Sequence, residues 1–251
     1  MGHRTDGPEA DTREIDWADF DAVLFDLDGV LTPTAEVHEH AWAELFRDFG
    51  FTSEDYLRYV DGKPRYDGVR SFLESRDVHL PEGSPDDAPG EGSICAMGNR
   101  KNDLFNEIIE RDGIEAYPGS VALLDLLDGL GVRQAVVSSS KNAPTVLAAA
   151  GLAHRFEHVV DGSTAVAEAL PGKPAPDMFL HAAELLGASP QRSVVVEDAE
   201  SGVTAGAAGG FALVLGVARG DNAATLAERG AHVVVADLAE TLPRPGSRGT
   251  P

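Results

Sequence analysis

Four acidic residues follow two apolar runs of the sequence, and their placement could support metal-dependent chemistry. Asp26 and Asp28 flank Leu27 directly after the run AVLF, and Glu197 and Asp198 follow the run SVVV. Carboxylates gathered at one place repel one another unless a cation neutralises them. Hard oxygen ligands without His or Cys suit Mg²⁺ better than zinc or copper. We therefore predict that these four residues hold Mg²⁺.

Two further groups would complete a site for chemistry at phosphorus. Ser138 follows the apolar run QAVV, and Lys173 lies in the segment GKPAPD at 172–177. Mg²⁺ and Lys173 would neutralise the phosphoryl oxygens, Ser138 would orient them, and Asp26 would be the covalent acceptor. Asp28 would protonate the leaving oxygen and then deprotonate the next nucleophile.

The four acidic residues also have a simpler, structural interpretation. Asp26 and Asp28 are suited to a turn before Gly29, and the pair at 197–198 is suited to capping the next helix. A single DxD pattern would not distinguish the two interpretations. The combination of DxDG, a serine after a strand, a KPxPD loop and an ED pair after another strand favours a site.

The elements that would position these residues alternate between strand and helix. Apolar runs predict strands at 21–27, 134–138, 158–161, 193–197, 212–215 and 232–235, and periodic segments predict helices at 34–47, 121–130, 142–150, 177–186 and 201–208. This alternation is typical of an α/β fold with a doubly wound, Rossmann-like parallel sheet. Ligands bind beyond the carboxyl ends of such strands, so Asp26, Ser138 and Glu197 should converge at one edge.

Residues 35–115 follow a different pattern. Helical stretches are predicted at 54–60, 66–76 and 99–111 without a convincing strand, and the Gly/Pro/acid segment 81–93 is predicted to be a surface loop. We predict a small helical cap domain at 35–115, inserted after the first strand of a core formed by 20–34 and 116–243. Flexible tails are predicted at 1–19 and 244–251.

The composition limits the classes of partner. The 251 residues include 20 Lys and Arg against 42 Asp and Glu, a formal charge of −22. Such a chain repels nucleic acid and anionic membrane surfaces. We see no apolar run of membrane-spanning length and no secretory signal, and the single Cys95 excludes an internal disulfide. We expect a monomeric, cytoplasmic protein that acts on a small molecule.

Basic residues in the predicted cap are candidates for a second phosphate site. Arg65 lies in VDGKPRYDG at 60–68, a predicted loop beside a helix, where its guanidinium could clamp a phosphate. Lys101 and Asn102, in NRKND, are predicted to open a cap helix whose N-terminal N–H groups favour anions. On the core side, Ser140, Lys141 and Asn142 follow Ser138. For Arg65 or Lys101 taken alone, the alternative is a solvated surface charge.

The motifs that span the predicted core resemble the haloacid dehalogenase superfamily. They are FDLDGVLTPT, VVSSSKN, GKPAPD and VVEDAESG. The resemblance implies an aspartyl-phosphate on Asp26, acid and base chemistry by Asp28, and Mg²⁺ held by Asp26, the Asp28 carbonyl and Asp198. It also implies that Glu197 supports the metal site, that Ser138 and Lys173 bind the transferring phosphoryl group, and that the cap opens and closes over the site.

The cap motifs are more specific and resemble the β-phosphoglucomutase-like subfamily. The stretch DLDGVLTPTAEVHEHAW, with GKPR, RKND and SSSKN, carries this resemblance. It implies that His38 couples cap closure to the positioning of Asp28; a lone helical His is otherwise most often structural or exposed. It also implies that the sugar or its phosphate is contacted by Trp42, Arg65, Lys101 and Asn102. The full predicted set of phosphate- or substrate-binding residues is Thr34, His38, Trp42, Gly62, Arg65, Lys101, Asn102, Ser138, Ser139, Ser140, Lys141, Asn142 and Lys173.

The sequence departs from this subfamily at three places. Pro33 replaces an acid before Thr34, Asp61 stands before Gly62 where a basic residue would be more typical, and 81–93 looks like an insertion. These differences concern the hinge and the substrate more than the chemistry.

Three functions are compatible with the motifs. The first is a phosphomutase that interconverts β-glucose 1-phosphate and glucose 6-phosphate through a bound bisphosphate, which requires a distal phosphate site and exclusion of water. The second is a phosphatase acting on a sugar phosphate or a similar small molecule. The third, a catalytically idle phosphate-binding protein, is disfavoured because every chemical position is occupied.

Overall fold

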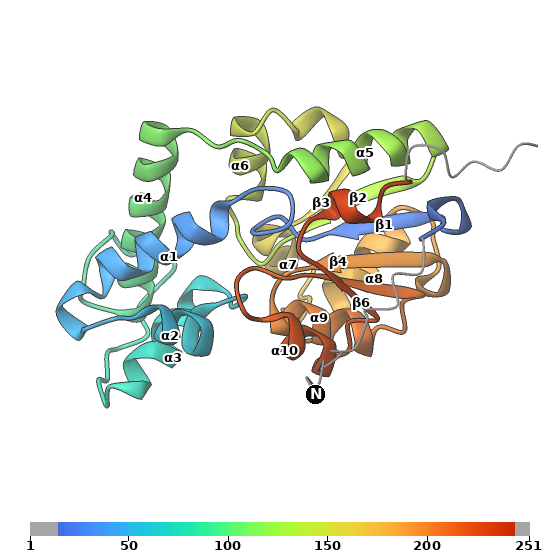
Figure 1. The fold of residues 1–251 in the computed structure, drawn as a ribbon. Coiled ribbons are helices and arrows are strands. Elements are labelled where there is room, and N and C mark those ends of the chain that lie inside the picture. The colour runs from blue at the N-terminus through green and yellow to red at the C-terminus, as the bar shows by residue number, and fades with distance from the viewer. Residues whose placement is uncertain (1–14, 244–251) are drawn as a thin grey trace, which may run out of the picture.

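A computed structural model describes residues 15–243, and its centre is one parallel sheet (Figure 1). The six strands run in the order β3-β2-β1-β4-β5-β6 and all neighbouring pairs are parallel. Their bounds are β1 Ala22–Phe25, β2 Arg133–Val137, β3 His158–Val160, β4 Ser193–Glu197, β5 Leu213–Val217 and β6 Val233–Val235. The predicted doubly wound α/β fold is confirmed.

Helices cover both faces of the sheet because successive strand residues point to opposite sides. Val23 and Phe25 pack into the apolar cluster beneath α5 (Pro118–Leu130) and α6 (Ala143–Ala149). Ala22 and Leu24 pack into the cluster formed with α8 (Asp177–Leu185) and α9 (Glu200–Ala208). Two short helices, α7 (Gly162–Ala167) and α10 (Ala223–Glu228), complete the α/β part.

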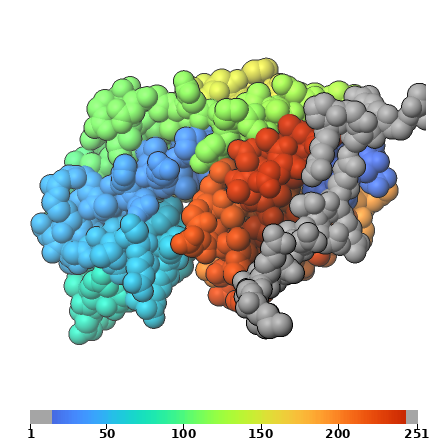
Figure 2. Space-filling view, viewed as in Figure 1, coloured from blue at the N-terminus to red at the C-terminus, as the bar shows by residue number. Residues whose placement is uncertain are grey.

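The elements between β1 and α5 form a second, helical lobe, which runs from blue to green in Figure 1. They are α1 (Thr34–Leu45), η2 (Arg47–Phe49), α2 (Ser53–Asp55), η3 (Tyr56–Val60), α3 (Arg65–Ser75) and α4 (Ile94–Asp112). An apolar cluster of its own holds the lobe together, with Phe46 and Phe72 at its centre. Figure 2 shows the blue and cyan part of this lobe meeting the orange and red part of the core along a boundary. We propose that residues 35–115 form the cap.

The segment 81–93 contains no helix or strand, as the sequence predicts for a loop. Side chains nevertheless attach it to the cap. Asn99 Nδ2 donates to the carbonyls of Pro85 and Asp87 at 3.0 and 2.9 Å, and Ser93 Oγ donates to Asp87 Oδ2 at 2.6 Å. The loop therefore has a fixed position on the surface of the cap.

The structure corrects several local predictions. Residues 15–19 are not a loose tail, because Trp17 is 1% exposed and its Nε1 donates to the Thr241 carbonyl at 3.1 Å. The rest of the predicted tails, 1–14 and 244–251, lies outside the described residues. Helix α4 begins at Ile94 rather than near Asn99, and α7 and α10 were not predicted. No helix within 15–243 has the length and apolarity needed to cross a bilayer.

Candidate active site

Strand register brings the predicted core residues to one edge of the sheet. Phe25 pairs with Val136 of β2 and Val196 of β4, so the next residue on each strand lies at the same level. The Asp26 N–H donates to the Val196 carbonyl at 2.9 Å, which extends the ladder by one residue. Asp26 therefore emerges between the ends of β2 and β4, where open α/β sheets bind ligands.

Lys173 links the ends of these three strands. Its Nζ donates to Asp26 Oδ1 at 2.5 Å, to Glu197 Oε1 at 2.6 Å and to the Val137 carbonyl at 3.0 Å. Burial favours the neutral amine, but Asp26 and Glu197 outweigh it and raise the pKa of Lys173 above its usual value. The ammonium group is therefore a permanent positive charge beside the Asp26 carboxylate.

Both carboxylate oxygens of Glu197 accept hydrogen bonds from within the protein. While Oε1 accepts from Lys173, Oε2 accepts from the N–H groups of Asp198 and Ala199, both at 3.1 Å. A Cβ on Gly202 would lie 1.7 Å from Oε1, so α9 must carry glycine there. Glu197 is thus placed to orient its neighbours rather than to bind a ligand directly.

Three carboxylates form a cluster suited to a cation. One oxygen each from Asp26, Glu197 and Asp198 lies within 4.8 Å of the others. Burial and the mutual repulsion of these acids raise the pKa values of Asp26 and Asp198, despite the opposing effect of Lys173 on Asp26. One lysine does not neutralise three acids of which two, Asp26 and Glu197, are buried, and an all-oxygen donor set fits a hard divalent cation such as Mg²⁺. Asp26 and Asp198 are the two with free carboxylate oxygens.

The carboxylate of Asp28 lies outside this cluster. Its Oδ1 accepts from Thr34 Oγ1, and His38 Nε2 is 3.4 Å from the same oxygen. Burial alone would raise the pKa of Asp28, but the nearby His38 and the hydrogen bond from Thr34 lower it to about 2. The Asp28 side chain is therefore not part of the acidic cluster, and the ligand that the family resemblance implies at this position is its main-chain carbonyl.

Lys101 completes this arrangement from the cap. Its Nζ donates to His38 Nδ1, and it lies 5.2 Å from the Trp42 ring centroid and 4.9 Å from that of Phe105. Burial lowers the pKa of Lys101 to about 7, against the opposing charge of Asp28. Lys101 and Asn102 lie in the middle of α4, so the prediction that they open a helix was wrong.

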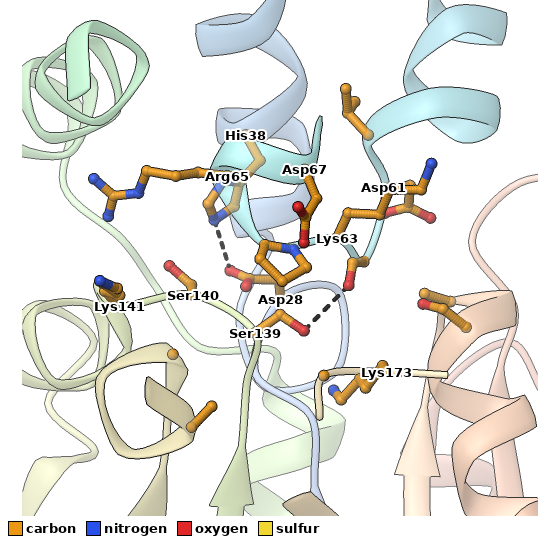
Figure 3. Close-up of a pocket in the computed structure, with 18 of the residues that line it drawn as sticks. Asp28, His38, Asp61, Lys63, Arg65, Asp67, Ser139, Ser140, Lys141 and Lys173 are labelled. Carbon is orange, nitrogen blue, oxygen red and sulfur yellow. Dashed lines mark hydrogen bonds and ion pairs between the residues drawn. The ribbon is translucent and has the colours of Figure 1, made fainter. Parts of the chain in front are cut away.

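A cavity of about 620 Å³ separates the cap from the core (Figure 3). Two residues of the predicted set do not line it: Thr34 supports Asp28, and Ser138 is fully buried, with its Oγ accepting from the Ser140 N–H at 3.1 Å. The predicted residues that line it are Asp26, Asp28, His38, Trp42, Gly62, Arg65, Lys101, Asn102, Ser139, Ser140, Lys141, Asn142, Lys173, Glu197 and Asp198.

Comparison with known proteins agrees with this architecture. A model of the haloacid dehalogenase-like hydrolase family matches residues 20–210. A β-phosphoglucomutase of Mycobacterium bovis is 48% identical over 238 residues, which cover 88% of this chain and 91% of that protein. The chain belongs to the haloacid dehalogenase-like hydrolase family. It is therefore an enzyme, and the resemblance to the β-phosphoglucomutase-like subfamily is confirmed.

Two further relatives show the range of this family. Hexitol phosphatase A of Escherichia coli is 35% identical over 193 residues, which cover 74% of this chain and 78% of that protein. The crystal structure of β-phosphoglucomutase from Clostridium difficile superposes with a TM-score of 0.72 at 26% identity, covering 88% of this chain and 92% of the other. Both a mutase and a phosphatase are thus similar to this family member.

Several basic residues that line the cavity of this haloacid dehalogenase protein have no acidic partner within residues 15–243, and Arg65 and Lys141 are two of them. Arg65 is the first residue of α3, not part of a loop as predicted, and it lines the cavity with Lys141. Within residues 15–243, no carboxylate forms an ion pair with either side chain. Figure 3 shows both on one side of the cavity, with Lys173 on the other. Positive charge is therefore available at both ends of the cavity.

Cap and core of this family member meet through polar contacts beside the cavity. Ser139 Oγ donates to the Gly62 carbonyl at 3.1 Å, and Asn142 Nδ2 donates to Asn102 Oδ1 at 2.7 Å. Gly62 has a φ of 68°, and a Cβ there would lie 2.2 Å from Ser201 Oγ. The chain needs glycine at this point of contact because a side chain would hold the cap away from the core.

Several lining residues were not predicted as site residues, and Tyr56 and Asp61 are two of them. Both line the cavity from the cap. Burial and the charge of Glu197 raise the pKa of Asp61 to about 6. A sequence signal for Asp61 was present, because this acid stands before Gly62 where a basic residue is more typical of the subfamily. Tyr56 lies in η3 and belongs to no recognisable motif.

Proposed function

We propose that this enzyme is a phosphomutase that interconverts β-D-glucose 1-phosphate and D-glucose 6-phosphate through a bound glucose 1,6-bisphosphate. The observation that carries the proposal is the pair of unpaired bases, Arg65 and Lys141, on the opposite side of the cavity from Lys173. A bisphosphate must be held at both ends, and a guanidinium is suited to a bidentate grip on the distal phosphate. The 48% identical β-phosphoglucomutase supports the choice of sugar.

Asp26 would carry the phosphoryl group between the two positions of the sugar. An oxygen of Asp26 forms the new O–P bond while the bond from phosphorus to the sugar oxygen breaks, and Lys173 lies against the accepting carboxylate at 2.5 Å. Asp26, Asp198 and the Asp28 carbonyl would hold Mg²⁺. When bound, Mg²⁺ would neutralise phosphoryl oxygens and relieve the repulsion within the acidic cluster.

Asp28 would move the proton in both half-reactions. Its low pKa, about 2, leaves it ionised at neutral pH and ready to accept the proton of the attacking 6-hydroxyl group. It then returns that proton to the 1-oxygen when the second transfer rephosphorylates Asp26. Because the proton is taken up and returned within one cycle, Asp28 need not be protonated from solvent.

The cap would keep water away while the bisphosphate reorients. The contacts Ser139–Gly62 and Asn142–Asn102 join cap and core beside the cavity. Closure excludes the competing nucleophile, and the His38–Asp28 contact ties closure to the position of the acid/base group.

The second candidate is a phosphatase of a sugar phosphate, which the similarity to hexitol phosphatase A supports. Asp61 also favours it, because a carboxylate at the cap weakens the hold on a second phosphate. The two functions differ only in whether water or a sugar hydroxyl receives the group from Asp26.

Product identification distinguishes the two functions. The protein is incubated with β-glucose 1-phosphate, Mg²⁺ and a trace of glucose 1,6-bisphosphate, and glucose 6-phosphate and inorganic phosphate are measured together. We expect glucose 6-phosphate to form faster, and the α-anomer serves as the matched control. Inorganic phosphate as the main product from every sugar phosphate tried would establish the phosphatase instead.

A further inference from the structure

The loop that follows β5 contacts both acid-bearing loops of the site, although it supplies no group to the reaction described above. Arg219 Nε donates to the Gly29 carbonyl at 2.6 Å, and Asn222 Nδ2 donates to the Asp198 carbonyl at 3.0 Å. The Asn222 side chain also holds the Arg219 main chain, because Asn222 Oδ1 accepts from the Arg219 main-chain N–H at 2.9 Å. One short loop thus holds the main chain next to Asp28 and at Asp198.

Arg219 is itself fixed in place by a second layer of contacts. Its guanidinium carbon lies 4.0 Å from the centroid of the Tyr117 ring, a cation–π distance, and its Nη1 donates to the Ala236 carbonyl at 3.4 Å. The Tyr117 N–H in turn donates to the Leu31 carbonyl at 2.9 Å. Arg219 and Tyr117 therefore hold the loop after Asp28 at two points, and a bond of the strand ladder anchors Ala218 to β6.

The two acid-bearing loops touch, so the position of one determines that of the other. A Cβ on Gly29 would lie only 1.8 Å from Asp198 Oδ2, so the Asp198 carboxylate rests directly against the Gly29 main chain. A small shift of the Gly29 peptide would displace Asp198 from the acidic cluster and would also turn Asp28. Phosphoryl transfer and cation binding are sensitive to displacements of this size.

We propose that Arg219 and Asn222 are positioning residues that keep the Asp28 loop and the Asp198 loop in register for cation binding and for phosphoryl transfer. The transfer part rests on the function proposed above, whereas the cation part rests on the acidic cluster alone. Neither residue touches the transferring group, and both act through main-chain carbonyls.

The test compares Arg219→Met and Asn222→Ala with a matched control, Arg229→Met. Arg229 also donates through Nε, to Glu200 Oε2 at 3.0 Å, but its ion pair is exposed and outside the site. Mg²⁺ binding is measured by calorimetry without substrate, beside thermal unfolding and the kcat and KM of the sugar-phosphate reaction. We expect Arg219→Met and Asn222→Ala each to weaken Mg²⁺ binding about tenfold and to lower kcat about as much, with a smaller change in KM.

Arg219→Lys is the rescue variant, because an ammonium can still donate to the Gly29 carbonyl but loses the planar contact with Tyr117. It should recover part of the Mg²⁺ affinity, and Arg229→Met should match the wild type. Wild-type Mg²⁺ affinity and kcat in both Arg219→Met and Asn222→Ala would overturn the proposal. If Arg219→Met does not fold, Asn222→Ala and Arg219→Lys decide it.

The calorimetric measurement separates this proposal from the proposed function. Weaker Mg²⁺ binding in the variants of a protein that turns out to be a phosphatase would support the positioning role and refute only the mutase. Unchanged Mg²⁺ binding and unchanged kcat in variants of a confirmed mutase would refute the positioning role alone.

Discussion

The core side and the cap side of the cavity are built differently. On the core side, Lys173 and Glu197 are buried, and their charges are matched by partners within 2.6 Å. On the cap side, Arg65 has no acidic partner within the described residues, and Asp61 carries a pKa raised to about 6. The difference indicates that the charged groups of the core are held in position before a ligand binds. On the cap, by contrast, the Arg65 charge has no partner in the part of the chain that the structure describes and can bind a substrate.

The largest effect should follow a change at the centre of the core side. Lys173→Met leaves Asp26 and Glu197 buried without their cation, which costs roughly 3–5 kcal/mol of the free energy of unfolding, and it should lower kcat by about 10²–10³-fold or more. Denaturant unfolding and steady-state kinetics measure the two effects. Arg192→Met, whose ion pair with Asp21 is at the surface, should lose less than about 1 kcal/mol. Similar losses in both variants would contradict the account.

Arg65→Ala tests the cap side. Loss of a charge-assisted contact to the distal phosphate corresponds to about 1.5–3 kcal/mol, so mutase flux should fall roughly 10–100-fold while any phosphatase side activity falls less. Arg100→Ala is the matched control, because Arg100 lies on α4, pairs with Glu107 and does not line the cavity. An equal loss of both activities in Arg65→Ala would exclude a distal phosphate role.

The pKa of Lys101 gives a pH-dependent prediction. Its pKa is about 7 in the folded protein and 10.5 ordinarily, so between these values the unfolded chain binds a proton that the folded chain has released. The free energy of unfolding should therefore rise with pH in this range, by at most about 1.4 kcal/mol per pH unit. Lys101→Met should lack this increment in denaturant titrations at pH 7 to 9. Parallel curves for both proteins would show that Lys101 titrates normally.

The smallest effect is expected at the contact between the two sides. Ser139→Ala removes the hydrogen bond to the Gly62 carbonyl but leaves the core-side charges in place, so kcat should change by less than about tenfold. The ratio of inorganic phosphate to glucose 6-phosphate should rise, because the closed cap is held less firmly. Ser163→Ala, a serine of α7 whose side chain makes no cap contact among the described hydrogen bonds, should leave the ratio unchanged. If the ratio of inorganic phosphate to glucose 6-phosphate is unchanged in Ser139→Ala, contacts other than this hydrogen bond hold the cap closed.

Sequence patterns predicted the core side better than the cap side, for a physical reason. Asp26, Ser138 and Glu197 follow buried strands, and the edge at which parallel strands end is fixed by the topology. The start of α4 was placed five residues late because the Gly/Pro/acid loop runs up to it. A local signal existed, since Ser93 caps the helix by accepting from the Ala96 N–H.

Contacts between distant segments could not be predicted. Arg219 and Gly29 are 190 residues apart, and nothing in the local sequence of either indicates the hydrogen bond between them. The separation of the Asp28 side chain from the acidic cluster likewise depends on Thr34 and His38, whose reach across the turn is a tertiary property. The short helices α7 and α10 were missed because six residues are too few to show a helical period.

The most direct test of the account is to locate the phosphoryl group on the protein. The enzyme is mixed with glucose 1,6-bisphosphate and Mg²⁺, treated at once with borohydride, which reduces an acyl phosphate to an alcohol, and digested for peptide mass spectrometry. We expect homoserine at position 26 in the treated sample and aspartate when the bisphosphate is omitted. Reduction at another carboxylate, or turnover that persists in Asp26→Ala, would contradict the central claim.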